Sequence, residues 1–289
     1  MPLPPLATVM IEPLVRAALL EDLGRAGDIT TDAIVPAEAH ANTVLVARQA
    51  GVVAGLDLAL LAFKLIDPSI IVSVERPDGS HLAAGDVIAR VDGPARGILT
   101  GERVSLNFLC HLSGIATQTA AIVESVRGHR ARISCTRKTT PGLRAIQKYA
   151  VRVGGGANHR FGLDDAVLIK DNHIAVAGGI RPAVERVRSH VGHLVKIEVE
   201  IDTLSQLEEA LSVGADAVLL DNMTPDAMRR AVAMVGGRAI TEASGRITPA
   251  TAPAIAASGV DLISIGWLTH SVAALDIGLD YAGEQSAKG

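Results

Sequence analysis

The sequence is poor in aromatic residues and in cysteine, and it has no overall excess of positive charge. Aromatic residues make up 2% of the 289 residues, which argues against binding of single-stranded nucleic acid, because such proteins stack bases on aromatic side chains. The net charge of −4 also disfavours a nucleic-acid partner. Two cysteines, Cys110 and Cys135, are too few for a disulfide framework or a zinc site. We therefore expect two small buried cysteines and a reducing compartment.

Signals for export and for membrane insertion are also missing. Residues 1–25 have no basic lead, and proline and glutamate interrupt their apolar stretch, which is unlike a signal peptide. The uncharged stretch 104–123 contains Asn107, His111 and Gln118, which is unlike a membrane span. We expect a cytoplasmic protein that binds no membrane.

Positive charge is instead concentrated in one segment. From Arg137 to His173 there are seven arginines and lysines against three acids, a net charge of +4 within a negatively charged chain. Such a concentration indicates an anionic ligand. The nucleotide-binding patterns GxGxxG and GxxxxGK[ST] are absent.

The pattern of apolar runs predicts two domains. In residues 1–113, strand-like runs at 43–47, 70–74 and 87–91 are separated by turn signals, and a helix is expected at about 97–126. In residues 114–271, strand candidates begin near 132, 166, 194, 216, 238 and 262. Helices are expected between them, with start signals at Thr203, Thr224-Pro225 and Thr248-Pro249. The alternation predicts a parallel β/α barrel, and the tail, 272–289, is expected to return to the first domain through a strand at 274–281.

The predicted strand VKIEVEID carries charge on one face. Period-two alternation places the apolar residues on one side of the strand. The charged residues lie on the other side, and these are Lys196, Glu198, Glu200 and Asp202. Charges inside a barrel are costly unless they are paired or used. An edge strand with a solvated face is the alternative, and we favour a functional role.

Charged residues also follow the apolar parts of other strands. Lys170 ends the apolar run VLIK and Asp221 ends VLLD, and Glu200 and Arg137 also lie at the ends of predicted strands. β/α barrels build their active sites at the carboxyl ends of their strands. The last two strands lead into EASGRIT and SIGWLTHS, whose glycines fit a phosphate-binding turn. The sequence thus predicts a phosphate site, inward carboxylates and a cationic wall suited to a ligand with more than one carboxylate.

These motifs resemble one enzyme family over nearly the whole chain. TRKTTPGLR, KYAVRVGGGANHRFGLDDAVLIKDNHI, EVEID, LLDN and SIGWLTHS resemble the quinolinate phosphoribosyltransferases, also called carboxylating nicotinate-nucleotide pyrophosphorylases. The resemblance implies an N-terminal α/β sandwich, an incomplete β/α barrel and a homodimer. It implies conversion of quinolinate and phosphoribosyl pyrophosphate (PRPP) into nicotinate mononucleotide, pyrophosphate and CO2 with Mg2+, a step of de novo NAD biosynthesis.

The resemblance also implies roles for individual residues. The quinolinate pocket would consist of Arg103, Thr136, Arg137, His159, Arg160 and Lys170, with Arg103 reaching in from the neighbouring subunit. Lys138 and Lys170 would meet the pyrophosphate of PRPP. Glu200 and Asp221 would serve the ribose hydroxyls and Mg2+. The 5′-phosphate would be held by Ser244, Gly245 and Gly266.

Two positions depart from the family pattern. Cys135 stands where the family usually has Asp, and Arg246 replaces a glycine of the Ser-Gly-Gly turn. Three alternative functions remain open on the residues: a related phosphoribosyltransferase-like protein linked to molybdenum transport, a Schiff-base aldolase using Lys170, and a non-catalytic barrel that binds a phosphosugar. The intact Arg137-Lys138 and His159-Arg160 pairs favour quinolinate.

Overall fold

The computed structural model describes residues 3–282, which form two compact units. The first unit contains the chain up to Gln118, the segment Ala145–Gly155 and the residues from Ser271 on. The second contains Thr119–Arg144 and Gly156–His270. The segment 145–155 thus belongs to the first unit although it follows the first barrel strand in the chain.

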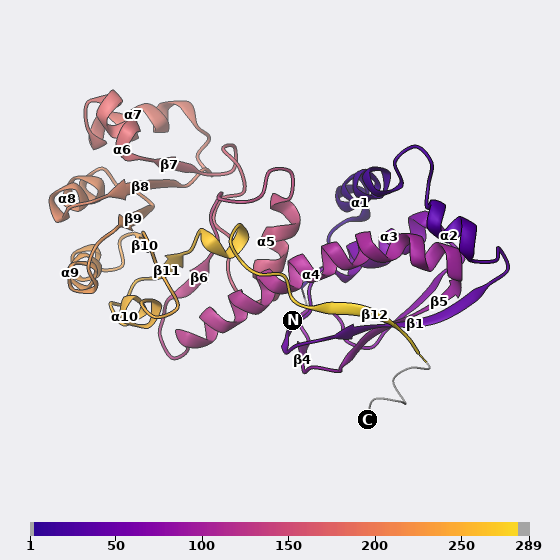
Figure 1. Cartoon of the computed structure of the whole chain (residues 1–289). Coiled ribbons are helices and arrows are strands. Elements are labelled where there is room, and N and C mark those ends of the chain that lie inside the picture. The colour runs from indigo at the N-terminus through magenta and orange to yellow at the C-terminus, as the bar shows by residue number, and fades with distance from the viewer. Residues whose placement is uncertain (1–2, 283–289) are drawn as a thin grey trace. The chain divides into compact units, whose positions relative to one another are not determined.

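The first unit is built on a four-stranded antiparallel sheet. Its strands are β1 (His40–Ala47), β3 (Ile71–Val74), β5 (Val87–Pro94) and β12 (Ile277–Tyr281). Their order is β12-β1-β5-β3, and a two-stranded pair, β2 (Gly51–Val52) with β4 (His81–Leu82), accompanies the sheet (Figure 1). The strand predicted in the tail is confirmed, since β12 pairs with β1 from Ile277 opposite Ala47 to Tyr281 opposite Thr43.

Helices complete the first unit. They are α1 (Thr8–Leu23), α2 (Ile29–Ile34), α3 (Leu56–Ile66), α4 (Ala95–Ser125), which ends in the second unit, and α5 (Arg144–Val153). One carboxylate ties two of these helices to a turn. Asp78 accepts hydrogen bonds from the backbone N–H groups of Gly55 and Leu56, where α3 starts, and from the hydroxyl of Tyr149 on α5. Burial raises the pKa of Asp78, which these three donors counteract.

By length and composition alone, α4 could cross a membrane, but half of its most apolar window is buried within the protein. Its residues Ile98, Leu106 and Leu109 pack in the core of the first unit against the sheet and α3. This is the behaviour of a core helix. Cys110 on the same helix is half-buried, whereas Cys135 is fully buried as expected.

The second unit contains a six-stranded parallel sheet. Its strands are β6 (Arg132–Ser134), β7 (Val167–Ile169), β8 (Ile197–Ile201), β9 (Ala217–Asp221), β10 (Ile240–Ser244) and β11 (Leu262–Ser264). The order is β6-β11-β10-β9-β8-β7 (Figure 1). Among the described residues no strand joins the two edges β6 and β7. The predicted incomplete β/α barrel is thereby confirmed.

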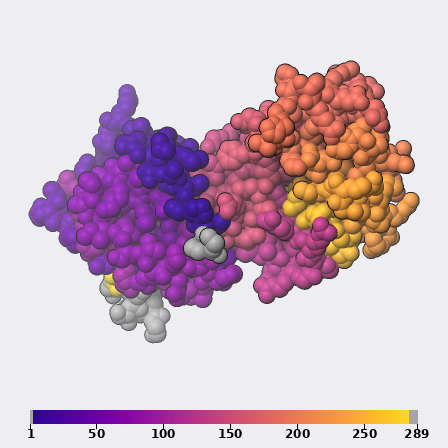
Figure 2. All heavy atoms as spheres, turned by 180° about the vertical axis from the view of Figure 1, so that it is seen from behind, coloured from indigo at the N-terminus to yellow at the C-terminus, as the bar shows by residue number. Residues whose placement is uncertain are grey.

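Helices connect these strands and cover the sheet. They are α6 (Asp171–Ala177), α7 (Ile180–His190), α8 (Leu204–Ser212), α9 (Pro225–Val235), α10 (Ala252–Ala256) and the 3-10 turn η1 (Trp267–Thr269). The apolar faces of α7 to α10 and the strands share one core, which includes Val199, Val218 and Ile263. In Figure 2 the residues of this region, coloured salmon to orange, form a continuous outer surface.

Most of the predicted helix starts are confirmed. Thr203 caps α8 and forms the predicted capping box with Gln206, and Thr224 caps α9, which begins at Pro225. The start predicted at Thr248 is wrong, because α10 begins at Ala252. Thr248 instead exchanges hydrogen bonds with Thr251 in a turn that precedes the helix.

The charged strand is shorter than its alternation predicts. β8 begins at Ile197, since the preceding Val195 N–H donates to Gly192 in a turn. Lys196 forms an exposed ion pair with Asp216, at 2.6 Å from Nζ to Oδ1. The predicted inward position of Lys196 is therefore wrong. Glu198 and Glu200 are the two acids of β8 that lie within the sheet.

Candidate active site

A pocket of about 430 Å³ lies at the carboxyl edge of the parallel sheet, within the second unit. Its titratable lining residues are Arg137, Lys138, His159, Arg160, Lys170, Glu200, Asp221 and Glu242. Thr136, Ser244 and Ser264 add hydroxyl groups, and Leu168 and Leu219 add apolar surface. The strand ends therefore bring together cations and carboxylates from segments far apart in the sequence.

Arg137 lies close enough to Arg160 for its charge to act on the Arg160 guanidinium. Burial lowers the pKa of Arg160, and the neighbouring Arg137 lowers it further. Arg160 Nη1 donates to the backbone oxygen of Ala166 at 3.0 Å. Arg137 Nε is buried, and no acceptor for it is present among the described residues. A buried donor without a protein partner is expected to meet a ligand or water.

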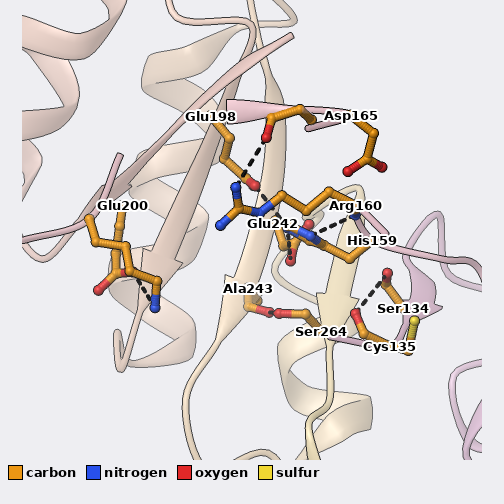
Figure 3. A network of polar contacts seen from close by, with 12 residues as sticks. Ser134, Cys135, His159, Arg160, Asp165, Glu198, Glu200, Glu242, Ala243 and Ser264 are labelled. Carbon is orange, nitrogen blue, oxygen red and sulfur yellow. Dashed lines mark hydrogen bonds and ion pairs between the residues drawn. The ribbon is translucent and has the colours of Figure 1, made fainter. Parts of the chain in front are cut away.

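Glu200, on β8, lies apart from Arg160 and His159 (Figure 3), and Asp221 is on the adjacent strand β9. Burial raises the pKa of Glu200, the ion pair with Lys170 opposes that rise, and the negative charge of Asp221 adds to it. Lys170 Nζ lies 3.8 Å from Glu200 Oε2. The neighbouring Asn222 contacts the second carboxylate, because its Nδ2 donates a hydrogen bond to an Asp221 carboxylate oxygen. Two carboxylates and one lysine thus form a compact charged group.

A third group of charges lies deeper, around His159 (Figure 3). His159 Nε2 lies 2.9 Å from Glu198 Oε2 and 3.6 Å from Glu242 Oε1. The Arg160 backbone N–H donates to His159 Nδ1 at 2.8 Å. Glu198 is on β8 and Glu242 is on β10, so acids from two strands lie beside the imidazole.

The turns after β10 and β11 approach the pocket closely. A Cβ on Gly266 would lie 2.8 Å from Lys138 Cδ, and a Cβ on Gly245 would lie 2.3 Å from Asn222 Oδ1. Gly245 has φ +102°, a conformation that favours glycine. At both glycines the backbone therefore lies close to a polar side chain: Lys138 at Gly266 and Asn222 at Gly245.

Arg246 has φ +49°, in the left-handed region, where the family pattern has glycine. A residue with a Cβ is strained there by about 1–2 kcal/mol. We expect Arg246→Gly to raise the free energy of unfolding by about 0.5–1 kcal/mol, because part of the relief is offset by the chain entropy of glycine. Urea unfolding of the purified variant measures this. Arg246→Ala keeps the strain and removes the cation, so an equal gain in that control would contradict the backbone explanation.

Comparison with known proteins shows which family has this architecture. Residues 28–113 match the model of the quinolinate phosphoribosyl transferase N-terminal domain, and residues 115–280 match that of the C-terminal domain. The chain belongs to the quinolinate phosphoribosyl transferase family.

Individual relatives agree over nearly their full lengths. The probable nicotinate-nucleotide pyrophosphorylase (carboxylating) of Bacillus subtilis is 45% identical over 272 residues, covering 94% of this chain and 93% of that protein. The Mycobacterium leprae nicotinate-nucleotide pyrophosphorylase (carboxylating) is 48% identical over 273 residues, covering 92% and 95%. The crystal structure of NadC from Streptococcus pyogenes has a TM-score of 0.93 at 41% identity, covering 96% of this chain and 99% of that one.

The pocket brings together most of the residues predicted from the family resemblance. Nine of them line it: Thr136, Arg137, Lys138, His159, Arg160, Lys170, Glu200, Asp221 and Ser244. Gly245 and Gly266 lie in the turns beside it. Arg103 is not part of the lining, and it is exposed on α4 in the first unit.

Two buried acids of the site have no role among those predicted from the sequence. Glu242 lines the pocket, and Glu198 lies against His159. A signal for Glu242 was present, because period-two alternation on β10 places it on the same face as Ser244. Glu198 was recognised as inward-facing, but no motif in the sequence connects it with His159.

Proposed function

We propose that this protein transfers the phosphoribosyl group of PRPP to quinolinate and releases pyrophosphate, CO2 and nicotinate mononucleotide. The observation that carries the proposal is the buried, unpartnered Nε of Arg137 beside Arg160, in a pocket that also holds fixed carboxylates. One half of the pocket suits an anion, and the other half suits a developing cation. The carboxylating relatives support this choice of reaction.

The adjacent carboxylates of quinolinate would bind to the arginine half. Guanidinium groups donate paired hydrogen bonds that match carboxylate oxygens. After burial, the positive charge of Arg137 is the next cause that lowers the pKa of Arg160, and a dianion between the two guanidinium groups would offset that repulsion. Lys170 and Thr136 would complete the contacts to the acid, and Lys138 would meet the pyrophosphate.

Glu200 and Asp221 would face the ribose. Loss of pyrophosphate leaves positive charge on C1′, as in glycosyl transfer through an oxocarbenium-like state. Carboxylates fixed on β8 and β9 stabilise that charge without reorganising. The pyridine nitrogen then forms the bond to C1′. When the 2-carboxylate departs as CO2, its bonding electrons remain on the ring, and the carbon takes up a proton.

The residues present fit a bound Mg2+. Glu200 and Asp221 offer hard oxygen donors. Burial is the largest cause of the raised pKa of Glu200, and the negative charge of Asp221 adds to it, so a cation bound between the two carboxylates would relieve their repulsion. When bound there, Mg2+ would stabilise charge on the departing pyrophosphate. Ser244 and the backbone of Gly245 and Gly266 would hold the 5′-phosphate, because glycine allows the close approach.

We also propose a homodimer in which Arg103 of one subunit completes the acid site of the other. The support is the family resemblance together with the exposure of Arg103 on α4. A cytoplasmic location also remains a proposal.

Replacing either arginine of the acid site should weaken quinolinate binding selectively. We expect Arg137→Ala and Arg160→Ala each to raise the quinolinate KM about tenfold or more, since each removes a charge-assisted contact of about 1.5–3 kcal/mol. Steady-state kinetics with each substrate varied in turn would measure this, with PRPP binding followed by calorimetry. Unchanged quinolinate kinetics in both variants would remove these residues from the acid site.

Product analysis tests the function itself. The protein is incubated with quinolinate, PRPP and Mg2+, and nicotinate mononucleotide and pyrophosphate are quantified by chromatography. We expect both products to depend on all three additions. Binding of PRPP without any nucleotide product would indicate the non-catalytic phosphosugar-binding barrel instead.

A further inference from the structure

The imidazole of His159 makes hydrogen bonds through both of its nitrogens. Nδ1 accepts from the backbone N–H of Arg160 at 2.8 Å. Nε2 lies 2.9 Å from a carboxylate oxygen of Glu198 and 3.6 Å from one of Glu242. The side chains are 12%, 11% and 2% exposed respectively, so these contacts are largely shielded from water.

These partners select one tautomer. A backbone N–H can only donate, so Nδ1 must present its lone pair and carry no proton. A neutral ring then has its proton on Nε2, which donates it to Glu198, while the Glu242 carboxylate lies nearby at 3.6 Å, beyond hydrogen-bond distance. The neutral Nε2–H form satisfies both contacts, whereas an imidazolium would place an Nδ1–H against the Arg160 N–H.

This tautomer is unsuited to binding a metal ion at the cluster. His159, Glu198 and Glu242 have potential ligand atoms within 4.8 Å of one another. A metal-binding histidine normally donates its second ring N–H to an acceptor. Here the second nitrogen is itself an acceptor, so Nε2 keeps its proton and has no lone pair to offer.

We propose that His159 is a positioning residue: a neutral Nε2–H imidazole, hydrogen-bonded to Glu198 beside Glu242, that fixes the backbone of Arg160. This rests on the proposed function, because Arg160 is assigned there to the acid. The ring connects acids of β8 and β10 to the peptide from which the guanidinium of Arg160 extends (Figure 3). The positive charge that meets quinolinate then comes from the arginines and lysines, and His159 contributes none of it.

The tautomer is measured first, without substrates, by NMR of the intact protein with 15N-labelled histidine rings near neutral pH. The sequence has nine histidines, so His159→Gln identifies the relevant signals. We expect one protonated nitrogen, Nε2, and one unprotonated nitrogen, Nδ1. An imidazolium, or a proton on Nδ1, would overturn the proposal even in an enzyme that turns over quinolinate normally.

A double-mutant cycle then tests whether His159 acts through Arg160. We expect His159→Ala to raise the quinolinate KM about tenfold in the wild-type background but less than about twofold in the Arg160→Ala background. His129→Ala, at an exposed histidine, is the matched control and should change neither value. Equal effects in the two backgrounds would mean an independent contact with the acid.

These two measurements separate the proposals. If the protein makes no nucleotide from quinolinate, the proposed function fails while the tautomer result still stands. If quinolinate is turned over but the cycle is additive, the function holds and the positioning role fails.

Discussion

Nicotinate should be a far poorer substrate than quinolinate, with kcat/KM lower by on the order of 10³ or more. Quinolinate carries adjacent carboxylates at positions 2 and 3 of the pyridine ring, whereas nicotinate has only the one at position 3. With nicotinate bound, part of the group around Arg137 and Arg160 would be desolvated without a partner. The buried Arg137 Nε already has no protein acceptor among the described residues. An unsatisfied buried donor is costly, and this cost falls on nicotinate alone.

The measurement is a comparison of kcat/KM for the two acids at saturating PRPP and Mg2+. Arg137→Ala provides the internal control. It removes the group that nicotinate leaves unpaired, so it should bring the kcat/KM values of the two acids closer together. Comparable use of both acids by the wild-type protein would contradict the assignment of the arginines to two carboxylates.

Neutralising either ribose-facing carboxylate should remove most of the turnover. We expect Glu200→Gln and Asp221→Asn each to lower kcat by about 10²–10³, equivalent to about 2.7–4 kcal/mol, the loss typical of deleting one preorganised charge-stabilising group. The amides keep the shape of the side chains, so circular dichroism and thermal unfolding should show folded proteins. Glu200 is partly buried beside Lys170, and its charge is therefore only partly screened by water.

Asp216→Asn is a matched control for these substitutions. Asp216 directly precedes β9, at the opposite end of the strand from Asp221, and pairs with Lys196. The same chemical change should leave kcat unchanged there. Near-normal turnover in both Glu200→Gln and Asp221→Asn would mean that the inward carboxylates are structural.

Much of the second unit could be predicted from local pattern. Apolar runs located all six strands, and the capping residues Thr203 and Thr224 located two helix starts. Parallel strands deliver their carboxyl ends to one edge, which is why Lys170, Glu200 and Asp221 were expected to meet. The prediction failed where side chains compete with the pattern, as when Lys196 pairs with Asp216 outside the strand.

The contacts of His159 could not be predicted in this way. Its partners Glu198 and Glu242 lie on β8 and β10, on either side of β9, where Glu198 pairs with Ala217 and Glu242 with Leu219, so the strand order determines that both acids lie near the imidazole. That order depends on the whole sheet. The left-handed backbone conformation of Arg246 could not be predicted from its neighbours in the sequence either, because only the glycine in the family pattern indicated a strained turn.

The stoichiometry of CO2 and pyrophosphate tests the central claim most directly. The protein is supplied with PRPP, Mg2+ and quinolinate labelled in the 2-carboxylate, and released label and pyrophosphate are counted over time. If phosphoribosyl transfer and decarboxylation occur together in this pocket, one CO2 should appear for each pyrophosphate at every time point. Pyrophosphate release without matching CO2, or CO2 release without PRPP, would contradict the account.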